Sequence, residues 1–256
     1  AGVGGMKRVL LLRHGESFAQ GFSRQERWKP ENAFLRDAPL GAPGEAQARE
    51  LRLHLAAEPP ELVVCSPLTR ALQTALLAFG SALPHAELRE LAPRGYGDVG
   101  SQQQPECRGR PLSELRGDPR FEEGVVDWSL MEAEPEVWWS ETVEAPEHVE
   151  RRLARFCEWL RARPETTVAV VCHFNVVQRL LGIKGLKVAN CEPMVCSVLG
   201  REWKLLETWA PEASAEVNAV APEASADVNA GAEAELAVQA GGDAGFSARS
   251  AQEEHL

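Results

Sequence analysis

A histidine with an arginine before it and a glycine after it follows an apolar run near the start of the chain. Residues 6–13 read MKRVLLLR and residues 14–17 read HGES. The neutral imidazole of His14 holds a lone pair near pH 7 and can attack phosphorus, while the planar guanidinium of Arg13 matches the geometry of phosphate oxygens. Gly15 leaves room for a phosphate to approach the backbone. The triplet therefore indicates phosphoryl chemistry.

The elements that must position this histidine alternate between strands and helices. The sequence pattern predicts strands at 6–13, 61–65, 85–91 and 167–172, helices at 44–57, 68–80, 145–162 and 175–182, and a closing strand pair within 194–209. The continuous apolar run TVAVVC at 167–172 is typical of a buried parallel strand. We therefore expect an α/β fold, a three-layer α/β/α sandwich with a mostly parallel central sheet. His14 follows a buried strand, where such proteins expose their ligand sites.

Composition divides the chain into a folded part and a tail. We expect one domain over residues 1–210, with an insertion at about 92–145 that is rich in Pro, Gly and acidic residues and has no clean period. Residues 211–256 carry nine Asp or Glu and one Arg, and APEASAEVNA is repeated there as APEASADVNA. Low hydrophobic bulk and net negative charge predict a disordered, acidic, Ala-rich tail.

Charge and cysteine content exclude several classes of function. The formal net charge is −11, of which the tail carries −8, and neither part of the chain has a basic stripe. Nucleic acid and anionic membrane are therefore not expected as partners. The chain has no apolar run of ~18 residues and no leader-like start, which predicts a soluble, cytoplasmic protein. The six cysteines form no CxxC pair, which favours reduced thiols over disulfides.

Four segments, in order along the chain, form a more specific pattern: LRHGES at 12–17, CSPLTRALQTA at 65–75, LREL at 88–91 and VVCHFNVVQRLLG at 170–182. They resemble the motifs of the histidine phosphatase superfamily, the phosphoglycerate-mutase-like family (branch 1). The approach to the first helix, PLGAPGEAQA at 39–48, is similar to that of the family as well. The resemblance covers about residues 7–209. It implies a phosphoglycerate-mutase-like fold and a phosphohistidine intermediate.

The resemblance also implies a role for each matched residue. The implied catalytic residues are His14 as nucleophile, Glu90 as general acid and His173 as second histidine, and the implied phosphate ligands are Arg13, Arg70 and Gln20. A phosphate monoester brings roughly two negative charges, which arginines and a hydrogen-bonding histidine offset in the transition state. The scheme needs no metal and no cofactor. The expected partner is a small phosphorylated substrate, and the oligomeric state stays open.

The chain departs from the family pattern in three places. Phe174 follows the second histidine where the family has a small residue, and Gln20 stands where many members have Asn. The segment ELAPRGYG at 90–97 lacks the arginine spacing of the mutases. The third departure favours a phosphatase that hydrolyses phosphate monoesters over a phosphoglycerate-type mutase. A phosphate-binding pseudoenzyme that acts through a protein partner is the alternative from another class.

Other polar and aromatic residues have weaker claims to function. The histidines without a matched context are His54, His85, His148 and His255. The alternatives to Glu90 are Glu87 and Arg94. A loop cluster either receives a second anionic group of the substrate or is merely solvated, and it comprises Arg24, Arg27 and Lys29. We expect burial beneath the insertion, not a lid, for Trp128, Trp138 and Trp139, and a core position for Cys172.

Overall fold

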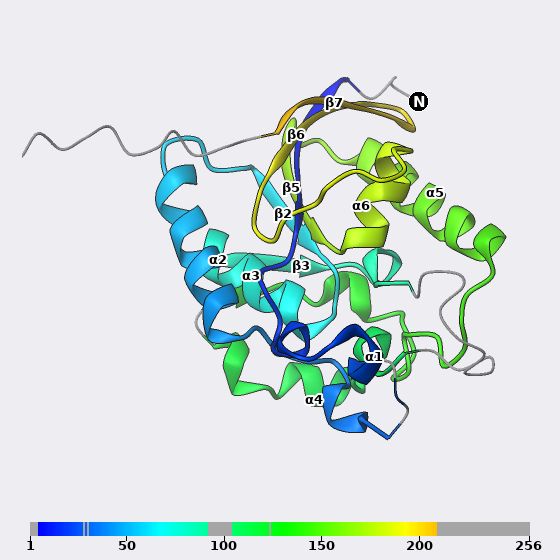
Figure 1. Ribbon diagram of the computed structural model, residues 1–256. Coiled ribbons are helices and arrows are strands. Elements are labelled where there is room, and N and C mark those ends of the chain that lie inside the picture. Colours follow the sequence, from blue (N-terminus) through cyan, green and yellow to red (C-terminus); the bar gives the residue numbers. More distant parts are fainter. Residues whose placement is uncertain (1–4, 28, 30, 92–103, 123, 209–256) are drawn as a thin grey trace, which may run out of the picture. The chain divides into compact units, whose positions relative to one another are not determined.

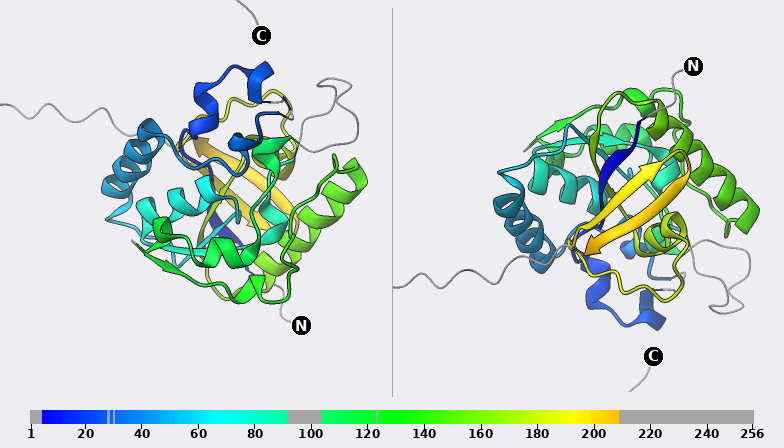
Figure 2. Two further views of the ribbon diagram at one scale, coloured as in Figure 1. Left: turned by 90° about the horizontal axis from the view of Figure 1, so that it is seen from below. Right: turned by 90° about the horizontal axis from the view of Figure 1, so that it is seen from above.

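The computed structural model describes residues 5–27, 29, 31–91, 104–122 and 124–208, and within these a seven-stranded mixed sheet organises the chain (Figure 1). The strands are β1 Lys7–Arg13, β2 Leu62–Cys65, β3 Ser81–Pro84, β4 Val125–Val126, β5 Thr167–Cys172, β6 Met194–Leu199 and β7 Glu202–Thr208. Their order across the sheet is β4-β3-β2-β5-β1-β6-β7. The first five of these pair in parallel, whereas β6 and β7 extend the sheet in antiparallel fashion, as the right-hand view of Figure 2 shows. The expected closing strand pair is thus confirmed.

Helices cover both faces of this sheet. The α-helices are α1 Arg24–Arg27, α2 Ala42–Leu55, α3 Thr69–Phe79, α4 Leu112–Arg116, α5 Pro146–Ala162 and α6 Phe174–Leu181. Short 3₁₀ turns lie at Phe18–Gly21, Ala33–Leu35, Ala86–Leu88, Pro105–Cys107, Pro119–Phe121 and Ser129–Met131. The left-hand view of Figure 2 shows α2 and α3 on one side of the sheet and α5 on the other.

Alternation along the central strands creates two separate cores. In β1, Leu10 and Leu12 join the apolar cluster that includes α3, while Val9 and Leu11 join the cluster that includes α5 and α6. Successive side chains of a strand point to opposite faces, so an uninterrupted apolar run is buried on both sides. The expected α/β fold, with a largely parallel sheet between two helical layers, is confirmed.

The third strand lies earlier than the sequence pattern predicts, so the prediction of a strand at 85–91 is wrong. Gly80, with φ +78°, ends α3, and the chain turns directly into β3. This strand pairs with β2 through Val64 and Leu83. The following segment forms a 3₁₀ turn instead, in which the Nδ1 atom of His85 accepts a hydrogen bond of 3.3 Å from the Glu87 backbone N–H. A side-chain acceptor at the start of a turn competes with the ladder of a strand.

The insertion contributes to the core as well as covering it. Its described residues add strand β4 to one edge of the sheet, and Leu115 and Met131 are fully buried in the cluster around α3. Trp138 and Trp139 are buried. Trp128 is partly buried and packs against the same cluster. Burial, which the sequence favours over a lid, is therefore confirmed for Trp138 and Trp139, whereas Trp128 is only partly buried.

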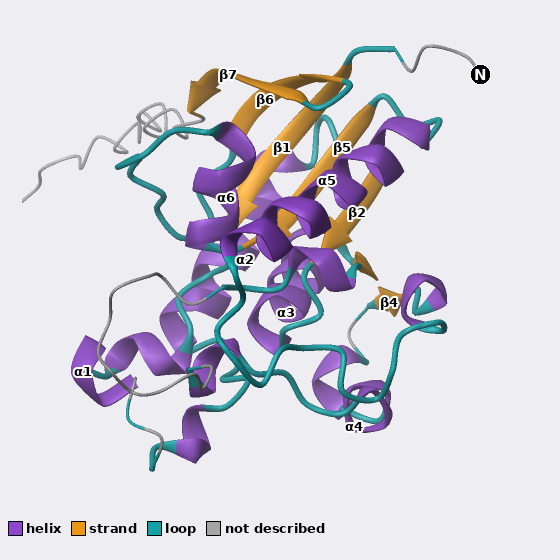
Figure 3. Ribbon diagram, turned by 90° about the vertical axis from the view of Figure 1, so that its right-hand side faces the viewer, coloured by secondary structure: helices purple, strands orange, loops and turns teal. Residues whose placement is uncertain are grey.

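Loops and short helices gather beyond the carboxyl ends of the parallel strands. Figure 3 shows α1 and α4 at this end, below the arrowheads of β1, β5 and β2. The predicted tail at 211–256 and Arg94 lie outside the described residues. No helix among the residues that the structure describes is long and apolar enough to cross a membrane. The cytoplasmic location stays a prediction.

Candidate active site

Two histidines lie side by side at the carboxyl ends of the two central strands. The parallel register of β1 and β5 pairs Arg13 with Cys172, so the next residues, His14 and His173, leave the sheet together. Their ring centroids are 5.0 Å apart and the rings meet edge to face. The backbone N–H of His14 donates to the Cys172 carbonyl at 3.0 Å, which fixes this arrangement. Cys172 itself is fully buried in the core, as expected.

The hydrogen bonds of His14 determine which ring nitrogen carries the proton. Nδ1 lies 2.6 Å from the carbonyl oxygen of Gly15, which can only accept, so Nδ1 must donate. Nε2 lies 3.1 Å from Nε of Arg70, which can only donate, so Nε2 holds the lone pair. Burial, followed by the positive charges of Arg70 and Arg13, holds the pKa of His14 well below its ordinary value. The imidazole is thus neutral, with the lone pair of Nε2 directed at the Arg70 guanidinium.

Arg70 and Arg13 approach the histidine pair from different elements. Arg70 lies in the first turn of α3, and its Nη1 donates to the Glu106 carbonyl at 2.8 Å. Arg13 ends β1, donates to the Val188 carbonyl at 3.2 Å, and has its guanidinium 5.6 Å from the ring centre of Phe174. The bulky residue after the second histidine therefore packs against Arg13, an arrangement in which a cation is attracted to an aromatic face.

His173 is fully buried and neither of its ring nitrogens has a hydrogen-bond partner among the described residues. Burial, followed by the positive charges of Arg70 and Arg13, lowers the pKa of His173 well below its ordinary value. Buried polar atoms are nearly always hydrogen-bonded in folded proteins. An unpaired imidazole beside His14 is therefore suited to contact a bound anion.

Glu90 is only 9% exposed, close to the end of the segment that follows β3. Its Oε1 accepts a hydrogen bond of 2.9 Å from the Leu91 backbone N–H. Burial raises the pKa of Glu90, although this hydrogen bond and the charges of Arg70 and Arg13 act in the opposite direction. The rival carboxylate of Glu87 is instead bound by Arg155 of α5 at 2.6 Å. Of the two, Glu90 has the protonation behaviour that a general acid needs.

Gln20 contacts the loop that follows His14. Its Oε1 accepts from the Ser17 backbone N–H at 3.1 Å, and its Nε2 donates to Oδ1 of Asn190 at 3.1 Å. Asn190 in turn donates to the His14 carbonyl at 2.6 Å. Gln20 and Asn190 thus hold the backbone at His14, and a role of Gln20 as a phosphate donor stays a prediction. Asn190 has no sequence signal, because it lies 176 positions from its partner.

The glycine after His14 is required by backbone packing. A Cβ atom at Gly15 would lie 2.6 Å from the carbonyl oxygen of Gly44, and one at Gly44 would lie 2.1 Å from the carbonyl oxygen of Glu16. The sequence suggested space for phosphate as the reason for glycine here, whereas the structure fills that space with the first turn of α2. The backbone N–H of Gly15 also donates to Oγ1 of Thr74 at 3.0 Å, which ties the loop to α3.

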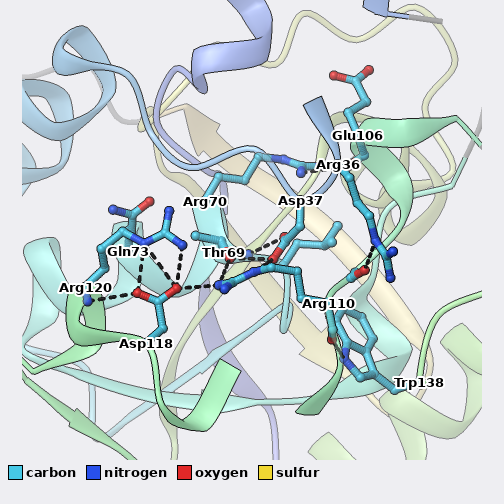
Figure 4. Close-up of polar contacts among 12 residues, drawn as sticks. Arg36, Asp37, Thr69, Arg70, Gln73, Glu106, Arg110, Asp118, Arg120 and Trp138 are labelled. Carbon is cyan, nitrogen blue, oxygen red and sulfur yellow. Dashed lines mark hydrogen bonds and ion pairs between the residues drawn. The ribbon is translucent and has the colours of Figure 1, made fainter. Parts of the chain in front are cut away.

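A buried polar cluster holds the start of α3, next to Arg70 (Figure 4). Asp37 accepts from the Thr69 backbone N–H at 2.8 Å and from its hydroxyl at 2.5 Å, so it caps the helix from another segment. Arg110 of the insertion donates to Asp37 at 3.0 Å and to Asp118 at 2.5 Å. Asp37 has φ +45°, a conformation that Asp and Asn tolerate better than other side chains. No sequence signal marks Asp37 as a capping residue, because it lies 32 positions before Thr69.

The remaining candidate residues lie at the edge of the site or away from it. Arg27 contacts Glu106 at 3.4 Å, Lys29 is exposed, and Arg24 lies in α1. His85 packs against Phe156 and Trp159, and His148 lies 3.6 Å from Glu144. His54 lies near the end of α2, and His255 is outside the described residues. Neither His85 nor His148 joins the pair formed by His14 and His173.

Fold and motif order together define an α/β protein of the phosphoglycerate-mutase-like class. The sequence profile of the histidine phosphatase superfamily (branch 1) matches residues 9–207. The chain therefore belongs to that superfamily. It is 29% identical over 196 residues to phosphoglycerate mutase-like protein 1 of Arabidopsis thaliana, covering 65% of this chain and 68% of the relative. It is also 29% identical over 177 residues to the uncharacterized phosphatase PhoE of Bacillus subtilis, covering 69% of this chain and 76% of the relative.

Solved structures share the fold at lower sequence identity. A proposed α-ribazole-5′-P phosphatase from Escherichia coli superposes with a TM-score of 0.52 at 22% identity, covering 80% of this chain and 97% of its own. A phosphoglycerate mutase from Bacillus anthracis gives a TM-score of 0.51 at 16% identity, covering 81% of this chain and 94% of its own. Phosphatases and mutases thus share this architecture, so the fold does not by itself select one activity.

Proposed function

We propose that this protein is a metal-independent phosphatase that hydrolyses small phosphate monoesters through a phosphohistidine on His14. The observation that supports this most is the state of His14: its Nδ1 donates to Gly15 while its Nε2 lone pair faces Arg70. A phosphate oxygen that takes over the Arg70 hydrogen bond would release that lone pair at the position where phosphorus arrives. Binding of phosphate to Arg70 would thus also free the Nε2 lone pair of His14 for attack.

In the first step the Nε2 lone pair of His14 forms a bond to phosphorus while the bond from phosphorus to the leaving oxygen breaks. Arg13, Arg70 and the unpaired imidazole of His173 stabilise the negative charge on the transferred group. Glu90 gives its proton to the leaving oxygen, which departs as an alcohol. The raised pKa of the buried Glu90 keeps that proton available.

In the second step a water molecule attacks phosphorus and the Glu90 carboxylate takes its proton. The electrons of the N–P bond return to Nε2, so inorganic phosphate leaves and the neutral imidazole is restored. A mutase shares the first step and differs in the group to which His14 passes the phosphoryl group, which is then not water. Arg27, a further cation near the two arginines, is offset by Glu106 at 3.4 Å, which weakens its attraction for the carboxylate of a phosphoglycerate. This pairing favours hydrolysis over mutase activity.

Turnover of p-nitrophenyl phosphate with and without EDTA tests the activity and its independence of metal together. We expect hydrolysis in both conditions, and its loss in His14→Ala. A radiolabelled phosphate ester should give wild-type protein an acid-labile, base-stable label that His14→Ala lacks. His148→Ala, which replaces a half-exposed histidine on α5, is the matched control and should retain both. Full activity in folded His14→Ala would exclude the covalent mechanism.

A further inference from the structure

A fully buried arginine on α5 binds the segment that carries Glu90. Arg152 is 0% exposed, and its Nη2 donates to the Arg89 carbonyl at 3.0 Å. Its Nη1 donates to the Glu87 carbonyl. These two carbonyls lie one and three residues before Glu90. The guanidinium therefore bonds the backbone of this segment at two points, within its 3₁₀ turn and at the residue directly before Glu90.

A buried carboxylate completes the network. Glu144, whose side chain is 1% exposed, lies 3.2 Å from Nε of Arg152 and 2.6 Å from Nη2 of Arg89. Arg89 also donates to the Ala86 carbonyl at 3.1 Å. Glu144 thus links the arginine of α5 to the arginine adjacent to Glu90. The ion pairs and the carbonyl contacts act on the same short stretch of backbone.

Removing a guanidinium from water is costly unless its donors and its charge are both satisfied. Burial lowers the pKa of Arg152, so a fully buried position opposes its charged form. An apolar residue could fill space between α5 and this segment without that cost, but it could not bond two carbonyls. Such carbonyls at irregular backbone otherwise have no ladder to fix their direction. Arg152 is therefore suited to fixing the backbone conformation of the residues that lead to Glu90.

We infer that Arg152 is a positioning residue for proton transfer: it acts through the backbone of residues 87–89 to hold Glu90 at the leaving oxygen. This inference rests on the proposed function. Arg152 does not need to touch the substrate. The effect of losing it should therefore follow the need for general-acid help, which grows with the basicity of the leaving oxygen. A purely structural role would lower the hydrolysis of all esters alike.

The test compares kcat/KM for an alkyl phosphate with kcat/KM for p-nitrophenyl phosphate in Arg152→Gln and Arg152→Lys, because kcat/KM includes no step after release of the alcohol. Because small displacements of a catalytic group have large effects on rate, we expect roughly a 10- to 100-fold loss for the alkyl ester in Arg152→Gln. The loss for p-nitrophenyl phosphate should stay within about threefold, since its phenolate departs without a proton. Lysine retains the charge but not the fork of donors. The loss for the alkyl ester in Arg152→Lys should therefore be smaller than the loss in Arg152→Gln.

Lys7 offers a matched control at the other end of the sheet. It is also buried, and its Nζ donates to the carbonyls of Arg163 and Glu165, each at 2.7 Å. Lys7→Gln should lower the melting temperature without changing the ratio of the two rates. If Arg152→Gln does not fold, Arg152→Lys and Glu144→Gln provide the same comparison.

The outcomes separate the inference from the proposed function. Wild-type protein inactive on both esters would overturn the proposed function and the inference with it. Active wild type with an unchanged ratio in the folded variants would overturn the inference alone. A ratio that also shifts in Lys7→Gln would assign the effect to general loss of stability, and would equally overturn it.

Discussion

Arg70 and Glu90, to which the proposed function assigns phosphate binding and proton transfer, are held in different ways. Arg70 lies in the first turn of an 11-residue helix, whose starting N–H group is capped by Asp37. Glu90 follows a 3₁₀ turn and is reached through irregular backbone, whose carbonyls are bonded by Arg152. A helix fixes its residues by internal hydrogen bonds, so one external cap orients many side chains together. Irregular backbone has to be bonded from outside, one carbonyl at a time.

This difference predicts different consequences of damage. Loss of the Asp37 cap should loosen the start of α3, and so affect both phosphate binding and global stability. Loss of the contacts around Arg152 should instead affect the step that needs a proton. Four measurements test this contrast, and they follow in order of decreasing effect.

The largest contrast is expected for Glu90→Gln. Its kcat/KM for an alkyl phosphate, which includes no step after release of the alcohol, should fall by roughly 100- to 10,000-fold, the range of positioned proton transfer, because an alkoxide cannot leave without a proton. The loss for p-nitrophenyl phosphate should be much smaller. Glu87→Gln is the matched control, since that carboxylate is bound by Arg155. Equal losses for both esters would assign Glu90 to electrostatics, and a selective loss in Glu87→Gln would show that the acid is misassigned.

Asp37→Asn should affect both esters equally. Asparagine tolerates the positive φ of this position and retains an acceptor for Thr69, so the change mainly removes the charge that faces Arg110. We expect kcat/KM to fall about tenfold for each ester through weaker phosphate binding by Arg70, which corresponds to ~1.4 kcal/mol. Unfolding by denaturant should show a loss of ~1–3 kcal/mol. A leaving-group dependence like that of Glu90→Gln would erase the contrast between the two regions.

Buried neutral histidines should make the fold sensitive to acid. The folded-state pKa values of His14 and His173 are lowered well below normal, and that of His85 is lowered to about 4. Unfolded chains bind protons at these positions first, so stability is lost as the pH falls below ~6.5, by up to ~1.4 kcal/mol per pH unit for each histidine.

Denaturant unfolding of wild type and His14→Gln between pH 7 and pH 5 measures this effect. His14→Gln should show a shallower loss of stability over this range. The raised pKa of Glu90 contributes with the opposite sign, and the comparison of variants cancels it. His148→Gln, at a half-exposed position outside the histidine pair, is the matched substitution for comparison. An unchanged slope in His14→Gln would contradict a depressed pKa at that site.

The smallest effect is expected from deletion of residues 211–256, which provides a baseline for the other variants. The segment lacks the apolar bulk to join a core. Activity on both esters and the melting temperature should remain nearly unchanged. A substantial drop in either would place the domain boundary beyond residue 210.

The sequence predicts the parts of the site that follow buried strands. His14 and His173 each end a continuous apolar run, and parallel strands bring such positions to one edge of the sheet. Arg70 lies on a helix with clear start and end signals. The same reasoning misplaces β3, because the alternation of HAELREL suggests a strand while a side-chain hydrogen bond at His85 starts a turn.

Sequence patterns do not predict the residues that support the site. Asp37, Asn190 and Arg152 each bond a site segment that is at least 32 positions away in the sequence. A lone acid, amide or arginine in a loop or helix has no periodicity that distinguishes it from a solvated residue. Its role depends on which segments the tertiary fold brings together. Those contacts exist only after the sheet has formed.

The close approach of Gly15 and Gly44 limits how this protein can be redesigned. Each glycine would clash through its Cβ with main-chain atoms of the other segment, so neither position can be relieved by repacking a side chain. An engineer who wants to change the surroundings of His14 must therefore leave residues 15–16 and the first turn of α2 unaltered. Conversely, the exposed Leu53 of the same helix can carry a probe that leaves this contact intact.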